Sequence, residues 1–444
     1  MYHRLRVGLL VVFCLSIGNL FGLFAQHSTD YYSLSMVGNA GNGIFAPYYL
    51  SANKHGLVTH SKSGYLRASV FKGLEMNKRF SYEFGIDLVG LMSSTSPVSY
   101  YSDGNLKTYN PGVSSFFIQQ AYIGMKYRMI FISAGCRELT DEVVNFELSS
   151  GGLVWSGNAR PIPQVRAGFI DFVDIPFTKG WVQIKGELAY GKFMDNDFLR
   201  DHYNYYNQYI TTDALYHHKS ISFRSNPDKP FVVTIGAELA AQFGGTKRYY
   251  EKGILIDSLT MKSPTRLKDF FKILFPSSGD GQTNEGDQAY YYGNHVGQWN
   301  LSAEYRFKDN SSVRGYFEWY FDDASGMGKF NGWDGLWGLE YKSGKKNWLS
   351  NVVLEYLDMT NQSGPLNWCP SDYNDPKLDI EATGADDYYN NYFYNGWAHY
   401  GLSNGTAMAK SLLYNTDGYM RYKHNRIRGV HLGASGYIAP EWKY

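Results

Sequence analysis

Residues 298–308 read QWNLSAEYRFK, and a second stretch of the same kind, 313–322, reads VRGYFEWYFD. In both stretches apolar and polar side chains alternate, and the same alternation occurs in 80–88, FSYEFGIDL, and in 182–190, VQIKGELAY. Successive side chains of a β-strand point to opposite faces. The four stretches therefore predict strands with one apolar face and one charged face.

Three features indicate that these strands cross a membrane. They run for about 10 to 13 residues, as tilted transmembrane strands do, whereas soluble strands average about five or six. Short turns alternate with long connections along the chain, which is typical of barrels with tight periplasmic turns and long extracellular loops. Aromatic residues gather near the strand ends, as interface girdles do: Phe80, Trp181, Phe231, Trp299, Phe321 and Trp348.

The fold that these patterns predict is all-β. About thirteen strands follow Gly64, and an even number requires at least one more within 31–52. We expect a transmembrane antiparallel β-barrel of about 14 to 18 strands, with long extracellular loops and a short loop helix at 265–275. That helix is expected to pack over the barrel mouth; the alternative is a partner-binding or membrane-surface helix.

The inward faces of the strands carry charges of both signs. We expect Arg67, Arg137, Arg166, Arg306 and Arg314 to lie in the lumen among Glu83, Asp87, Glu187, Glu304 and Glu318. A mixed-charge interior is usually a structural network. The alternative interpretation of such a lining is a selective channel.

Composition and the N-terminus place the chain in an exported class. Basic residues upstream of the apolar run 7–24, with Ala25 before Gln26, predict a signal peptide at 1–25 and a single barrel domain at 26–444, possibly incomplete at its C-terminus. The formal net charge of +1 gives no electrostatic reason to bind nucleic acid. Cys136 and Cys369 follow the signal, and spacing does not decide whether they pair.

Several stretches resemble the Wzi family of capsule assembly proteins, in the version found in Bacteroides-like organisms. The most specific is WSGNARPIPQVR at 155–166, and weaker ones are APYYL at 46–50, LYHHKS at 215–220, NHVGQW at 294–299 and NRIRG at 425–429. The resemblance implies an outer-membrane barrel of Gram-negative bacteria, of about eighteen strands, whose mouth is obstructed by long loops. It also implies a lectin-like protein, not an enzyme, that anchors capsular polysaccharide at the cell surface, with lipid and capsule export machinery as further partners. Chains of this family continue beyond NRIRG, whereas this one stops at Tyr444, so a smaller or truncated barrel is expected.

Sugars stack on aromatic rings and pair their hydroxyls with amides and carboxylates. The last long loop and a shorter one before it offer that mixture. The candidate polysaccharide-binding residues are Trp333, Asp334, Trp368, Tyr373, Asp387, Tyr388, Tyr389, Asn391, Tyr392 and Trp397. The alternative is that these aromatics pack the loops into a plug.

Other functions find less support. The chain has no H-E-x-x-H helix, so no catalytic residues are assigned. His217 and His218 are neighbours on a strand and face opposite sides, so no metal or other cofactor is predicted. A saccharide-selective outer-membrane porin is the alternative function.

Overall fold

The computed structural model describes residues 30–95, 97–110, 115–141, 143–202, 208–284, 287–288, 291–322, 327, 332–362 and 386–444. The predicted signal peptide and Cys369 lie outside these residues. Among the described residues, no helix is both long and apolar enough to cross a membrane.

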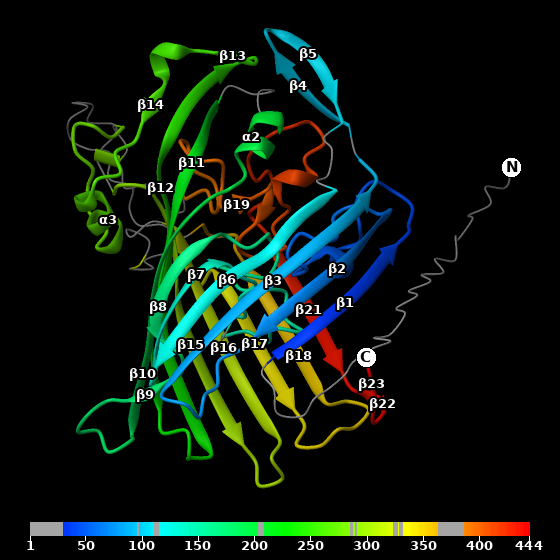
Figure 1. Cartoon of the computed structure of the whole chain (residues 1–444), viewed down its shortest axis with the longest axis vertical. Coiled ribbons are helices and arrows are strands. Elements are labelled where there is room, and N and C mark those ends of the chain that lie inside the picture. The colour runs from blue at the N-terminus through cyan, green and yellow to red at the C-terminus, as the bar shows by residue number, and fades with distance from the viewer. Residues whose placement is uncertain are drawn as a thin grey trace, which may run out of the picture.

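Within the described residues, one antiparallel sheet of seventeen strands forms the body of the molecule (Figure 1). β9 (Val173–Asp174) continues β8, and β13 (Ile254–Leu255) and β14 (Met261–Lys262) are short additions to β12, so fourteen strands form the wall. In order of pairing they are β1 (Asp30–Asn39), β2 (Ser63–Lys72), β3 (Phe80–Ser93), β6 (Phe116–Tyr127), β7 (Ile130–Cys136), β8 (Gln164–Phe169), β10 (Val182–Lys192), β11 (Gln208–Ser225), β12 (Phe231–Glu251), β15 (Asn294–Arg306), β16 (Ser312–Asp322), β17 (Gly335–Lys342), β18 (Asn351–Asp358) and β21 (Arg428–Ser435).

The smaller elements lie in the connections. The helices are α1 (Tyr48–Ser51), α2 (Asn196–His202) and α3 (Leu267–Leu274), with 3-10 turns η1 (Asp257–Leu259) and η4 (Leu412–Tyr414). Short hairpins pair β4 (Val98–Ser102) with β5 (Asn105–Tyr109), β19 (Ala398–His399) with β20 (Leu402–Ser403), and β22 (Tyr437–Ala439) with β23 (Trp442–Lys443).

The wall separates an apolar outside from a charged inside, as the alternation predicts. Outward side chains are exposed on strand after strand, for example Leu66, Ile86, Ile123, Ile132, Val165, Ile235, Leu339, Leu354 and Leu432. The inward arginines form ion pairs: Arg67 with Asp87 and Glu138, Arg137 with Glu83, Arg166 with Glu187, Arg306 with Glu304, and Arg314 with Glu340. The predicted transmembrane barrel, its first strand before residue 52 and its mixed-charge lumen are therefore confirmed.

A segment at 149–157, here called the plug segment, crosses the lumen. Its backbone amides donate to inward side chains: Ser150 N to Glu355 Oε2 (2.7 Å), Leu153 N to Glu318 Oε2 (2.8 Å) and Val154 N to Gln298 Oε1 (3.2 Å). Its two glycines are required. Gly151 has φ +100°, and a Cβ on Gly152 would lie 2.4 Å from the Asp141 carboxylate. The GG pair thus allows the backbone to pass close to the Asp141 carboxylate inside the barrel.

The expected position of the loop helix was wrong. α3 does not cover the barrel mouth; it packs against the outer face of the wall beside β11 and β12, at the left of Figure 1. Phe270 and Ile273 face the wall, with the Phe270 ring 5.2 Å from Tyr190 and 5.3 Å from Phe243. The amphipathic pattern is real, but sequence spacing does not say which side of a wall an apolar stripe covers.

Glu355 offers the sharpest test of the plug, because its carboxylate also accepts from Ser149 Oγ (2.6 Å) and Tyr316 OH (2.5 Å). Glu355→Ala leaves three buried donors without that acceptor, at about 1–3 kcal/mol each. We expect the variant to show conductance events in planar bilayers where the parent protein shows almost none. Glu304→Ala, which breaks an inward ion pair away from the plug segment, is the control. A Glu355→Ala protein as silent as the parent would contradict the account.

Candidate functional site

Four of the predicted sugar-binding residues are fully buried. Trp397 donates its indole N–H to Val154 O (2.7 Å), and Tyr389 OH donates to Leu153 O (2.5 Å), so both are tied to the plug segment. Tyr388 OH donates to Asp334 (3.0 Å), whose other oxygen accepts from Asn361 N (3.0 Å). In this conformation none of the four reaches a polymer, and the three rings pack the loops together, which is the arrangement of the alternative prediction.

Trp333 is exposed but belongs to a different surface. Its ring stacks on Trp319 at 4.8 Å and an interplanar angle of 3°, and Phe317 and Trp337 continue the row with a 3.8 Å stack. Phe317 and Trp337 are register partners on the outward face of β16 and β17. This row is the aromatic girdle of the barrel wall, where one end of a ring meets lipid and the other meets water.

The remaining predicted residues divide into four cases. Asp387 is exposed, and its carboxylate accepts from Asn390 and from Asn425 (2.6 Å). Asn391 caps a turn by accepting from the amides of Phe393 and Tyr394. Tyr392 is 56% exposed. Trp368 and Tyr373 lie outside the described residues.

Tyr392 is the exposed member of an aromatic cluster, here called the tyrosine platform, that also contains the half-buried rings of Tyr209, Tyr249 and Phe393. The Tyr209 ring lies 5.0 Å from Tyr249, 5.5 Å from Tyr392 and 5.1 Å from Phe393. Burial raises the pKa of both Tyr209 and Tyr249, so their phenols stay protonated and can donate. The Arg421 guanidinium lies 5.8 Å from the Tyr392 ring. The platform thus combines flat apolar faces, hydroxyls and one cation.

Sequence reasoning found only Tyr392 of this platform: Tyr209 and Tyr249 come from distant strands, and Phe393, the neighbour of Tyr392, was not among the candidates. β11 and β12 extend above the rest of the wall (Figure 1), and their register runs through Ala214–Gly244 and Thr212–Thr246. Between these pairs, Asp213 and Gly245 both have positive φ, 59° and 78°, which kinks the hairpin. Beyond the kink, Tyr209 and Tyr249 face one another as register partners. In the sequence, the length of both strands was the feature that could have indicated this extension above the wall.

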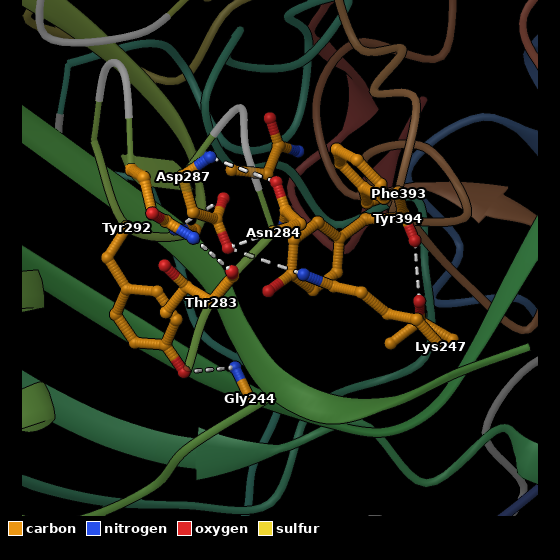
Figure 2. Close-up of polar contacts among 12 residues, drawn as sticks. Gly244, Lys247, Thr283, Asn284, Asp287, Tyr292, Phe393 and Tyr394 are labelled. Atoms are coloured by element: carbon orange, nitrogen blue, oxygen red, sulfur yellow. Dashed lines mark hydrogen bonds and ion pairs between the residues drawn. The ribbon is translucent and has the colours of Figure 1, made fainter. Parts of the chain in front are cut away.

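A buried ion pair supports the platform from below. Lys247 Nζ lies 3.3 Å from Asp287 Oδ2, and Asn284 Nδ2 donates to the same oxygen at 2.7 Å (Figure 2). The ammonium also lies 5.0 Å from the Phe393 ring and 4.8 Å from Tyr394. Burial raises the pKa of the Asp287 carboxyl, an effect that Lys247 opposes. Loop 276–294 and the last loop are thereby joined through one lysine.

A second junction ties the last loop to the loop after β10. The Tyr400 amide donates to Asp195 Oδ2 (3.0 Å), and His399 bridges Arg160 O (2.9 Å) and Met194 N (3.2 Å) with its two ring nitrogens. Burial raises the pKa of Asp195 to about 7 and lowers the pKa of His399 to about 4. Among the described residues, no group of three or more His, Cys, Asp or Glu side chains is arranged to hold a metal ion.

The fold and this site define a class of protein: a transmembrane β-barrel whose lumen is crossed by its own chain and whose extracellular loops form a consolidated aromatic surface. No family model matches the chain, and no curated protein matches it in sequence. Among solved structures it is similar to Wzi of Escherichia coli, described as an outer-membrane protein involved in group 1 capsule assembly and a carbohydrate-binding β-barrel, at 14% identity over 93% of this chain and 78% of that one, with a TM-score of 0.49. It is also similar to a mutant of the Rh. blastica porin, at 11% identity over 74% of this chain and 94% of that one, with a TM-score of 0.27.

The Lys247–Asp287 pair predicts a non-additive pair of substitutions. Lys247→Met leaves a buried carboxylate without its cation, which typically costs about 3–5 kcal/mol, whereas replacing both partners by apolar groups costs far less. We expect faster proteolysis of loop 276–294 in Lys247→Met and in Asp287→Leu, and a partial return to the parent rate in the double variant. Rates that simply add would show that the two side chains are not coupled.

Asp195 predicts a pH dependence of the extracellular loops. Because its folded pKa, about 7, exceeds the ordinary value of 3.8, the folded state binds this proton more tightly. The contribution of this proton to the free energy of unfolding is complete below about pH 4 and is lost as the pH rises to about 7. Asp195→Asn should reduce the loss of thermal stability between pH 5 and pH 8, whereas Asp197→Asn, at a highly exposed neighbour, should not. Equal losses in both variants would contradict the assignment.

Proposed function

We propose that this chain is a non-enzymatic outer-membrane protein that binds surface polysaccharide of the capsular kind and holds it at the cell surface. The observation that carries the proposal is the tyrosine platform on a plugged barrel. Aromatic faces stack against sugar rings, phenols and amides pair with hydroxyls, and Arg421 offers a partner for acidic groups on the polymer. Each contact is weak, so retention of a long polymer rests on many of them acting together.

The segment that most resembles the Wzi family supports the same proposal through its position. It begins in the plug segment, where the His55 amide donates to Gly157 O (2.6 Å), and continues to Asn158, which donates to Ser403 O (3.2 Å). The Arg160 guanidinium then lies over Phe117 at 3.9 Å and over Tyr400 at 4.7 Å. These contacts join the segment to the last loop and so to the support of the platform. A role beside capsule export machinery is part of the proposal.

A saccharide-selective porin is the second candidate, and cavities within the lumen favour it. One, of about 110 Å³, is lined by Arg166, Glu187, His218 and Glu238 among others. Another, of about 180 Å³, is lined by Arg224, Glu304, Arg306 and Arg314 among others. If the chain is a porin, the unmodified protein should conduct ions. If it is an anchor, ions should pass only when a substitution has loosened the plug segment.

The test is the binding of surface polysaccharide, purified from the strain that carries this gene, to the barrel in lipid nanodiscs. Tyr209→Ala and Tyr392→Ala each remove about 0.5–1.5 kcal/mol of ring stacking, so the double variant should bind on the order of tenfold more weakly. Trp333→Ala, at an exposed ring in the girdle, is the matched control and should bind as the parent does.

The same variants can be compared in cells. In the deletion strain and in the double variant, polysaccharide should appear in the medium while its total synthesis is unchanged. Polysaccharide that stays attached in the deletion strain would refute the anchor, and parent conductance in bilayers would then favour the porin. Product release from the polymer by purified protein would instead indicate an enzyme.

A further inference from the structure

α3 is fixed firmly to the outside of the barrel. Tyr190 OH donates to Phe270 O (3.0 Å), and Lys219 Nζ donates to Ile273 O (3.2 Å) and to Leu274 O at the helix C-terminus. A cation at that end also interacts favourably with the helix dipole. Ile273 is fully buried. The helix is therefore a rigid part of the wall and not a swinging lid.

The loop around α3 is held equally well. Before the helix, Tyr292 OH donates to Pro264 O and accepts from the Gly244 amide at 3.2 Å (Figure 2). At the first turn, the Asp269 carboxylate accepts from the Arg266 amide (2.8 Å). These contacts fix which face of α3 points away from the barrel.

That outer face is apolar. Leu267 is 76% exposed, Phe271 56% and Phe275, the residue that caps the helix C-terminus, 69%, and a spacing of four residues puts all three in one stripe. Lys268 and Lys272 form a separate row beside the stripe. Exposing an apolar stripe of this kind to water is unfavourable, so we expect an apolar environment to cover it.

The height of α3 on the wall identifies that neighbour. The helix covers Ala241 and Phe243, while Ile235 and Phe231, lower on the same strand, are exposed. The ten residue-to-residue steps from Phe231 to Ala241 span about 33 Å of strand. At a tilt of about 40° this is about 25 Å of height, the height of the apolar belt of a membrane barrel. The stripe is thus continuous with the belt at its extracellular edge.

We propose that α3 is an interfacial helix that seats its Leu267–Phe271–Phe275 stripe in the outer leaflet, at the boundary between headgroups and acyl chains. The apolar stripe, not charge, dominates the contact, because Asp280 already pairs with Arg266 (2.8 Å), Lys268 (2.9 Å) and Lys272 (3.6 Å). The helix fixes how deeply this side of the barrel sits and hence the height of the β11–β12 hairpin above the membrane. The inference does not depend on polysaccharide binding.

The experiment is site-directed spin labelling in a Cys136→Ala/Cys369→Ser background. Labels at Phe271→Cys and Leu267→Cys are compared with a belt control, Ile235→Cys, and an aqueous control, Ile254→Cys, an exposed apolar residue of β13 next to the turn that joins β12 to β13, at the top of Figure 1. Heat-modified mobility on gels confirms that each variant is folded. In phosphatidylcholine vesicles, both helix labels should collide with oxygen and be shielded from a water-soluble nickel chelate, with a nickel-to-oxygen ratio several-fold below that of Ile254→Cys.

Helix labels as accessible to nickel as Ile254→Cys would overturn the proposal. A second arm adds an anionic lipid, phosphatidylglycerol. Unchanged label depth supports insertion through the apolar stripe. Insertion only when phosphatidylglycerol is present would show that headgroup charge holds the helix, and would overturn the assignment to the stripe.

Discussion

The structure depends on one constraint: a chain that enters a barrel lumen must find acceptors for its backbone amides, because wall strands pair only with one another. Here Glu355, Glu318 and Gln298 supply those acceptors from three different strands. These three side chains occupy inward positions of the same polar and apolar alternation that makes the outer face apolar. The pattern that seats the barrel in a membrane therefore also provides the means of filling it.

The plug segment in turn provides a floor for the last loop. Tyr389 and Trp397 donate to its carbonyls, so the aromatics that looked like sugar contacts are the supports of the loop. Above them the Lys247–Asp287 pair joins two loops, and the tyrosine platform lies on top. On the outside, the connection between β12 and β15 carries α3 to the membrane edge. Direct packing contacts thus connect the lumen, the extracellular surface and the helix that faces the lipid.

Sequence alone predicted what period-two alternation determines: the strands, their faces, the barrel and a lumen lined by charges of both signs, though not which of them pair, as Arg137 does with Glu83. It could not say which loop aromatics are buried, because Tyr388 and Tyr392 sit in the same polar, aromatic context and differ only in tertiary packing. The sequence could not show which side of the wall α3 covers, because that too depends on tertiary packing. Tyr209 and Tyr249 were missed because a platform assembled from two distant segments leaves no local motif.

The central claim is that the chain itself closes the lumen through hydrogen bonds to inward side chains. Backbone hydrogen exchange of the folded protein in nanodiscs, resolved at Ser150, Leu153 and Val154, tests it most directly. We expect protection at these three amides comparable to that of the wall strands β15 and β16. Exchange at the rate of an unstructured peptide would show a water-filled lumen and an open barrel.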